Sequence, residues 1–270
     1  MFKAVVTDLD GTLLNAEHKV SEFTRKTVKL LLKKGIKLYI ATGRNYLGAK
    51  EAMDELGVQI PLITSHGSVA FDENGNEIFS NKLKREYLDK VLNIDYKSFG
   101  KDIIITGYAG PNWFVTENLR EYFYNKKPDR TRYPQQITPE EFKKQDFTKI
   151  FFLGENHDEL LELENEIKRV IGEENISLLF ANEGSLEVFP ADCNKAKAAE
   201  VLLERDGLTL KDAVSFGDGL NDYDLITETG LGFAMGNSIY LLLEKLTDTE
   251  VIDSNANDGM AKKVRELFDL

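Results

Sequence analysis

The stretch KAVVTDLDGT, residues 3–12, decides the fold. Its first part, residues 3–9, is apolar and β-rich, which is typical of a strand buried on both faces in a parallel sheet. Asp8 and Asp10 stand at the carboxyl end of this predicted strand, and Gly11 allows a tight exit from it. The stretch therefore predicts a central strand that carries two carboxylates to the edge where open α/β sheets bind ligands.

Strands and helices alternate outward from this stretch. Ser21 is a good N-cap for a helix over residues 21–34, and a helix is also expected at 45–56. Strands are predicted at 36–41 and 60–64. After residue 188 the alternation of helices and strands resumes. A helix is expected at 195–204, a strand at 213–217, a short helix from Asp222 and a strand at 231–234. This alternation predicts an α/β protein with a doubly wound, mostly parallel sheet.

The middle of the chain has a different character. It is rich in aromatic and alternating polar residues, and it contains a capping box that starts at Thr138, an apolar strand at 149–153 and an amphipathic helix at 158–171. We therefore predict that residues 83–187 form an inserted α+β domain. Residues 1–82 and 188–270 then form one core domain.

Composition excludes several kinds of protein. The formal net charge of −12 disfavours nucleic acid and anionic membrane as partners, because those surfaces select clustered Lys and Arg. Cys193 is the only cysteine, so no internal disulfide or multi-thiolate metal site can form. No apolar run approaches the length of a membrane span. We expect a cytoplasmic protein that is a monomer or a weak homo-oligomer.

The acidic segments predict a metal site. Asp8 and Asp10 are two residues apart, and in an extended strand such side chains point to the same side, where a divalent cation would relieve their repulsion. Residues 217–222, GDGLND, place more carboxylates after a second predicted strand. Oxygen ligands without thiolate favour Mg²⁺.

The same residues supply the groups that phosphoryl transfer needs. One carboxylate of the first pair can attack phosphorus, and the other can move protons for the leaving group and for water. Thr42, the amide of Gly43, and Lys195 at a predicted helix start can hold the phosphate oxygens.

Four ordered segments resemble the motifs of the haloacid dehalogenase superfamily. These are residues 8–12 (DLDGT), 42–44 (TGR), Lys195 and 217–222 (GDGLND). Residues 234–237 (AMGN) and 254–259 (SNANDG) extend the resemblance to the Cof-type sugar-phosphatase subfamily, which has a large α/β cap of type IIB. The resemblance covers nearly the whole chain.

The resemblance implies a role for each matching residue. Asp8 would be the nucleophile and a metal ligand, and Asp10 the general acid and base that also binds the metal through its carbonyl. Asp218 would be the remaining protein ligand, with Asp222 supporting the metal's water shell. The groups implied to hold phosphate are the Leu9 amide, Thr42, Gly43, Lys195 and Asn221. The insertion would be the cap that selects a small phosphorylated metabolite.

The chain departs from the family pattern at two places. The usual Lys-Gly is Lys195-Ala196 here, and His66 stands where an asparagine is common. His66 either alters substrate preference or fills space, and Arg44 is expected at the rim of the site. His18 and His157 are expected in exposed loops. The basic cluster Lys126, Lys127, Arg130 and Arg132 is either a solvated face or a recognition patch on the cap.

Two alternatives to a phosphatase stay open at this point. A phosphotransferase such as a sugar phosphomutase would pass the phosphate to a second sugar hydroxyl instead of water. A receiver-like signalling module would also phosphorylate an aspartate beside Mg²⁺, although the second acid Asp10 and the insertion favour turnover.

Overall fold

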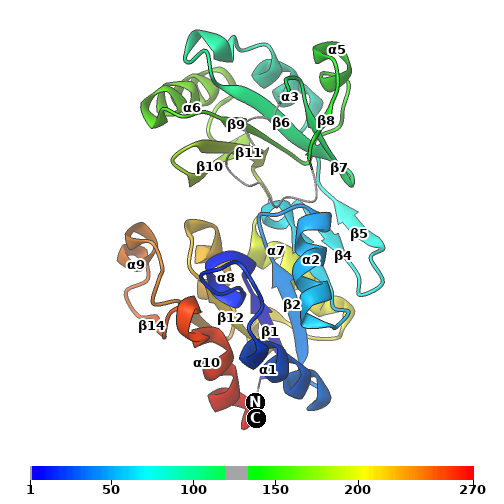
Figure 1. Cartoon of the computed structure of the whole chain (residues 1–270), viewed down its shortest axis with the longest axis vertical. Coiled ribbons are helices and arrows are strands. Elements are labelled where there is room, and N and C mark those ends of the chain that lie inside the picture. Colours follow the sequence, from blue (N-terminus) through cyan, green and yellow to red (C-terminus); the bar gives the residue numbers. More distant parts are fainter. Residues whose placement is uncertain (1, 119–132) are drawn as a thin grey trace. The chain divides into compact units, whose positions relative to one another are not determined.

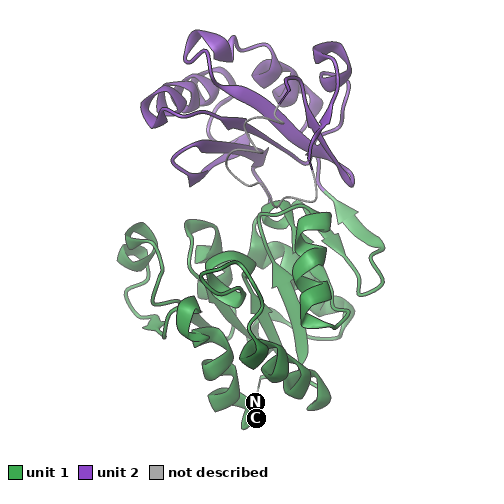
Figure 2. Ribbon diagram, in the orientation of Figure 1, with its two compact units in different colours: residues 1–80, 194–270 green, residues 81–193 purple. Residues whose placement is uncertain are grey.

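The chain folds into two compact units. The structure is a computed structural model that describes residues 2–118 and 133–270. Unit 1 consists of Met1–Ser80 and Asn194–Leu270, and unit 2 of Asn81–Cys193 (Figure 2). Unit 2 begins two residues before the predicted insertion, residues 83–187, and ends six residues after it. The larger difference arises because strand β11 (Ser185–Pro190) continues past residue 187 within the sheet of unit 2.

Unit 1 is built on one eight-stranded sheet with the order β14-β13-β12-β1-β2-β3-β4-β5 (Figure 1). The pairs from β14 to β3 are parallel, and only the edge pairs β3–β4 and β4–β5 are antiparallel. The predicted doubly wound, mostly parallel sheet is confirmed. Its strands are β1 (Ala4–Thr7), β2 (Lys37–Ala41), β3 (Leu62–Thr64), β4 (Val69–Phe71), β5 (Glu77–Ser80), β12 (Ala213–Gly217), β13 (Leu231–Ala234) and β14 (Glu250–Val251).

Both faces of this sheet are covered because side chains alternate along the central strands. Val5 packs into a core with the apolar sides of α1 (Glu22–Lys33), α2 (Tyr46–Leu56) and α10 (Gly259–Phe268). Its neighbours Ala4 and Val6 face α7 (Lys195–Arg205) and α8 (Tyr223–Glu228) on the opposite side. Helix α9 (Tyr240–Lys245) completes the helices of the unit. The strands are thus buried on both faces, as their continuous apolar sequence predicts.

Unit 2 has a six-stranded sheet with helices on one face. Its order is β10-β11-β9-β6-β7-β8, antiparallel except for the β7–β8 pair. Helices α3 (Arg85–Leu92) and α6 (His157–Ile171) share one apolar core with the sheet, and α5 (Pro139–Phe142) begins with the predicted capping box. The strands are β6 (Ile104–Ala109), β7 (Asn112–Val115), β8 (Gln135–Gln136), β9 (Lys149–Leu153), β10 (Ile176–Asn182) and β11.

The helices of the described residues are too short or too polar to cross a membrane. The four basic residues Lys126, Lys127, Arg130 and Arg132 lie outside the described residues.

Candidate active site

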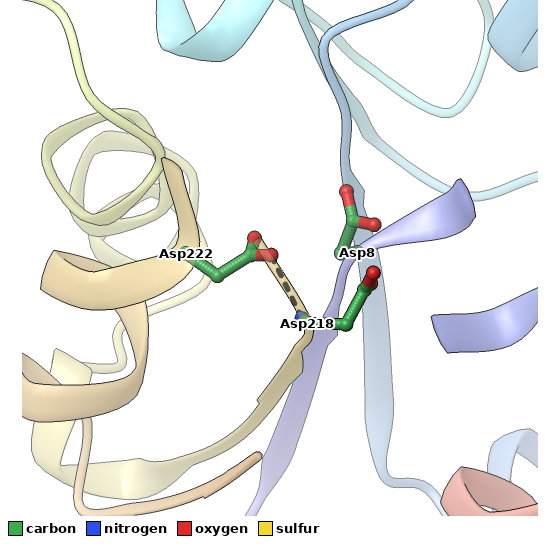
Figure 3. A group of neighbouring side chains, drawn as sticks. All are labelled: Asp8, Asp218 and Asp222. Carbon is green, nitrogen blue, oxygen red and sulfur yellow. Dashed lines mark hydrogen bonds between the residues drawn. The ribbon is translucent and has the colours of Figure 1, made fainter. Parts of the chain in front are cut away.

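Three aspartates meet where β1 and β12 end. These strands pair in register, with Thr7 opposite Phe216, so the residues that follow them emerge side by side. One oxygen of each carboxylate of Asp8, Asp218 and Asp222 lies within 4.8 Å of the others. Figure 3 shows Asp8 and Asp218 at the two strand ends and Asp222 reaching toward them from the helical segment that follows β12. The acidic segments singled out in the sequence therefore converge.

The loop after β12 is folded around Asp222. Asp222 Oδ2 accepts hydrogen bonds from the amides of Asp218 at 3.0 Å and Gly219 at 2.9 Å. A Cβ on Gly217 would lie 2.3 Å from the Cβ of Asp222, so a larger residue cannot stand there without moving the aspartate. Asp222 is consequently held in one orientation, with its second oxygen facing the cluster.

The turn that follows β1 fixes the position of Asp218. This turn spans Leu9–Leu13, and Gly11 adopts a φ of 79° within it. A Cβ on Gly11 would lie 2.3 Å from Asp218 Oδ2, and Thr12 Oγ1 donates a hydrogen bond to Asp218 Oδ1 at 2.7 Å. Gly11 is therefore required for the close approach of the two acidic loops, as well as for the backbone conformation.

Lys195 is the cation inside the cluster. Its side chain is fully buried at the start of α7, and its Nζ lies 2.5 Å from Asp8 Oδ1 and 2.6 Å from Asp222 Oδ1. The side chain of Asn194 caps this helix by accepting a hydrogen bond from the Lys197 amide at 2.7 Å. Burial disfavours the ammonium charge, but the charges of Asp222 and Asp8 outweigh it and raise the pKa of Lys195 above its usual value. Lys195 is therefore charged at neutral pH.

One ammonium does not balance the carboxylates of the cluster. Burial and the charges of Asp222 and Asp218 raise the pKa of Asp8 well above its usual value, even though Lys195 lowers it. Burial, followed by the charge of Asp222, raises the pKa of Asp218 to about 6. Burial is the largest cause of both shifts and the neighbouring carboxylates add to it, so the ionised cluster is poorly stabilised by the protein groups alone, and its oxygen donors are those that a hard divalent cation fits.

The carboxylate of Asp10 contacts Arg44 and His18 and does not belong to the cluster of three aspartates. Strand β1 ends at Thr7, so strand alternation does not set its direction. Arg44 grips it at two points: Nε donates to one oxygen at 2.6 Å and Nη2 donates to the other. His18 Nδ1 lies 3.4 Å from the same carboxylate. Neither contact was predicted, since the sequence placed Arg44 only at the rim and His18 in an exposed loop.

The Asp10–Arg44 pair sets the protonation of Asp10. Burial acts to raise the pKa of this carboxyl, but the hydrogen bonds and the charge of Arg44, aided by His18, hold the pKa below its usual value. The ionised form of Asp10 is therefore favoured in this arrangement.

Several of the residues predicted to hold phosphate are connected through the turn that follows β3. Thr42 is buried at the end of β2, and its Oγ1 accepts a hydrogen bond from the Arg44 amide at 3.1 Å. The segment Ser65–Gly67 after β3 lies against this turn, where the His66 amide donates to the Thr42 carbonyl at 3.1 Å. The imidazole of His66 also lies 3.0 Å from Asn221 Nδ2. His66 thus links two of the predicted phosphate-binding segments.

The AMGN and SNANDG segments support the turn after β1. Asn237 Nδ2 donates to the Gly11 carbonyl at 2.8 Å, and Asn255 Nδ2 donates to the Leu14 carbonyl at 2.9 Å. The Asn255 amide in turn donates to Asn237 Oδ1 at 2.9 Å. The resemblance gave these segments no role, whereas the structure shows them holding the loop that carries Asp10.

This chain is similar to known proteins in sequence and in fold. The model of the family described as haloacid dehalogenase-like hydrolase matches residues 5–264. The chain belongs to this family. The predicted superfamily is thereby confirmed, and together with relatives described as phosphatases the match also confirms the predicted phosphohydrolase class, so the signalling alternative loses its support.

Relatives described as phosphatases match this hydrolase over nearly their full length. A protein described only as a phosphatase from Buchnera aphidicola subsp. Baizongia pistaciae is 36% identical over 276 residues, which cover 99% of each chain. An HMP-PP phosphatase from Yersinia pestis is 30% identical over 262 residues, covering 97% of this chain and 93% of that protein.

Solved structures of the family share the fold. A haloacid dehalogenase-like hydrolase from Bacteroides thetaiotaomicron has a TM-score of 0.82 at 26% identity, over 99% of this chain and 100% of that one. A subclass IIB sugar phosphatase of the superfamily also gives a TM-score of 0.82, at 22% identity and the same coverage. At 22% identity, the likeness to the sugar phosphatase shows a shared fold and nothing more.

Proposed function

We propose that this hydrolase is a Mg²⁺-dependent phosphatase that removes phosphate from small phosphomonoesters, among them sugar phosphates, through an aspartyl-phosphate intermediate on Asp8. The single observation that carries the proposal is the contact of Asp8 with Lys195 inside a cluster of three converging aspartates. A nucleophilic carboxylate, a cation site and a buried ammonium then lie together, and these are the groups that a phosphoryl transfer requires.

The reaction takes place in two halves. An oxygen of Asp8 attacks phosphorus, the ester P–O bond breaks, and Asp10 gives a proton to the departing alkoxide. Asp10 then takes a proton from water as the water oxygen attacks the aspartyl phosphate, the Asp8–phosphorus bond breaks, and inorganic phosphate leaves. Atoms and charge balance over the cycle, since Asp8 returns as a carboxylate and Asp10 regains its proton.

The Asp10–Arg44 ion pair suits the second half of this cycle. It favours the ionised carboxylate, which is the form that accepts a proton from water. The first half needs the protonated form, so substrate binding must loosen the contact between Asp10 and Arg44. Arg44 is in this way a positioning residue for the proton-transfer group.

Asp8, Asp218 and the carbonyl of Asp10 would hold Mg²⁺, with Asp222 supporting it by a water molecule. When bound, the cation neutralises charge on the phosphate oxygens and on the attacking carboxylate. Lys195, Thr42, Gly43, Asn221 and the Leu9 amide would hold the phosphate oxygens. The excess negative charge at Asp8 and Asp218 supports this assignment of the cation site.

Unit 2 is proposed to be the cap that selects the substrate. Its sheet presents helices on one face and, on the other, a group of aromatic side chains that includes Tyr108, Trp113 and Phe151. Aromatic side chains can pack on the ring of a sugar-sized molecule. The names of the relatives, an HMP-PP phosphatase and a sugar phosphatase, support small organic phosphates as the substrate class. The cytoplasmic location and the assembly as a monomer or a weak homo-oligomer stay predictions.

The test is hydrolysis of p-nitrophenyl phosphate and of a panel of sugar phosphates with Mg²⁺, with and without a chelator. Asp8→Asn should abolish turnover, whereas Asp54→Asn, an exposed aspartate on α2, should retain it. Radiolabelled p-nitrophenyl phosphate, whose leaving group departs without protonation, should leave a hydroxylamine-sensitive label on Asp10→Asn protein, because only breakdown of the intermediate is slowed there. Full activity of Asp8→Asn would refute the proposal, and isomerised sugar phosphate without net phosphate release would identify a phosphotransferase.

A further inference from the structure

We propose that His66 is a positioning residue that fixes the Asn221 carboxamide and the Thr42–Gly43 turn in the arrangement that grips the phosphate group. This inference rests on the proposed phosphatase function and adds a residue to the machinery of that same site. Three features of His66 carry it: the hydrogen bonds of its turn, its burial and the partners of its imidazole.

The backbone at His66 lies in the left-handed region. Ser65 and His66 adopt positive φ values of 49° and 58° in the tight turn that joins β3 to the antiparallel β4. Glycine adopts this conformation most readily, and asparagine, aspartate and histidine adopt it more often than other residues do.

The turn is bound to the segments around it. The Ser65 amide donates to the Arg44 carbonyl at 2.9 Å, and the His66 amide donates to the Thr42 carbonyl at 3.1 Å. On its other side, a Cβ on Gly67 would lie 2.2 Å from the Asn194 carbonyl oxygen, directly before Lys195. The turn is thus wedged between the Thr42–Arg44 segment and the start of α7.

The imidazole occupies the space between the phosphate-binding segments. The His66 residue is only 4% exposed. A Cβ on Gly43 would lie 2.4 Å from His66 Cε1, so the ring rests directly on the backbone of Gly43. Its Nδ1 lies 3.0 Å from Asn221 Nδ2, a residue 155 positions away in the sequence.

The contact with the ring gives the Asn221 carboxamide one orientation. With Nδ2 donating to His66 Nδ1, the ring proton is assigned to Nε2. Asn221 Oδ1 then lies beside Gly219, where a Cβ would be only 2.7 Å from it. For this tautomer, rotation of the carboxamide would break the hydrogen bond, so the ring favours the orientation in which Nδ2 faces it and leaves the second N–H of Nδ2 for another acceptor such as phosphate.

Two substitutions separate positioning from simple space filling. His66→Gly removes the ring and readily adopts the positive φ, and His66→Asn restores a short hydrogen-bonding side chain that tolerates positive φ. We expect His66→Gly to raise both the KM for p-nitrophenyl phosphate and the inhibition constant of inorganic phosphate about tenfold, a factor typical of one lost hydrogen bond. His66→Asn should lie between this variant and the wild type.

A double-mutant cycle with Asn221→Ala tests whether His66 acts through Asn221. If it does, His66→Gly should weaken phosphate binding much less in the Asn221→Ala background than alone. His157→Asn, in unit 2, is the matched control and should leave both constants unchanged. Unfolding midpoints of all variants are measured in parallel, and His66→Asn serves should the glycine variant fail to fold.

The outcomes distinguish this inference from the function on which it rests. Wild-type phosphate inhibition in both His66 variants, or fully additive losses in the cycle, would overturn the role of His66 while the phosphatase stands. A wild-type protein that neither hydrolyses phosphomonoesters nor binds inorganic phosphate with Mg²⁺ would overturn both.

Discussion

Replacing Lys195 by methionine should separate the electrostatic role of this residue from its packing. The side chain is fully buried and its ammonium lies 2.5 Å from Asp8 and 2.6 Å from Asp222. Methionine keeps an unbranched apolar chain in the same space but removes the charge. The variant therefore leaves two buried carboxylates facing each other, with Asp218 close by and no cation among them.

The expected loss of unfolding free energy in Lys195→Met follows from the cost of leaving a buried charge unpaired. Removing one partner of a buried ion pair costs about 3–5 kcal/mol of unfolding free energy. The exposed Lys29 on α1 provides the control, since Lys29→Met should change the unfolding free energy by less than about 0.5 kcal/mol. We also expect Lys195→Met to lower kcat by about two to three orders of magnitude, as the loss of a charged donor at a transition state does.

The loss of stability in Lys195→Met should depend on pH. Burial already raises the pKa of Asp8, and loss of the ammonium raises it further above the value in the unfolded chain. A carboxyl with a raised pKa in the folded state destabilises the protein when it is ionised and ceases to do so once protonated. The stability difference between variant and wild type should therefore be largest near neutral pH and should narrow as the pH falls.

Urea unfolding with and without Mg²⁺ completes the assay. Bound cation should recover part of the lost stability, about 2.7 kcal/mol at a free concentration one hundred times its dissociation constant. A Lys195→Met protein as stable as Lys29→Met at neutral pH, with no gain on acidification or on addition of Mg²⁺, would refute the electrostatic account of this cluster.

Three further variants test the groups around the cluster. Arg44→Lys keeps the charge but not the two-point grip on Asp10, so kcat should fall about tenfold or more in steady-state assays, with little change in the unfolding midpoint. Asn255→Ala removes the hydrogen bond to the turn after β1 and should cost about 1 kcal/mol in urea unfolding together with a lower kcat. Gly11→Ala forces a Cβ into Asp218 and strains the backbone, so it should weaken Mg²⁺ binding in calorimetry more than it lowers stability.

The central sheet and its acidic edge could be predicted from the sequence for one physical reason. Strands buried on both faces need continuous apolar runs, and the bounds predicted for β12 and β13 agree with the structure, as do those predicted for β9 in the sheet of unit 2. Because parallel strands end at the same edge, carboxylates that follow two such runs must lie close together. The proximity of Asp8 and Asp218 could therefore be predicted from the sequence alone.

The edge hairpin and the side-chain partners could not be predicted in this way. Strand β5 (Glu77–Ser80) is short and has no fully buried residue, so it carries no strong pattern. The Asp10–Arg44 and His66–Asn221 contacts depend on where single side chains point after the backbone has folded. One signal was available: a histidine where the family commonly has asparagine marks a position whose side chain has changed function or partner.

Under the proposed function, the charge of the site would link metal binding to substrate binding. With Lys195 protonated and with Asp8, Asp218 and Asp222 all ionised, the state that a bound cation favours over the protonation that burial promotes, the cluster carries a formal net charge of −2 in a largely buried place. A phosphomonoester is itself a dianion near neutral pH, so it would be repelled from this cluster. One divalent cation cancels the charge of the protein groups, after which Lys195 and the amides can attract the phosphate. Phosphate should consequently bind measurably only with Mg²⁺ present, and tight binding of inorganic phosphate to metal-free protein would contradict this account.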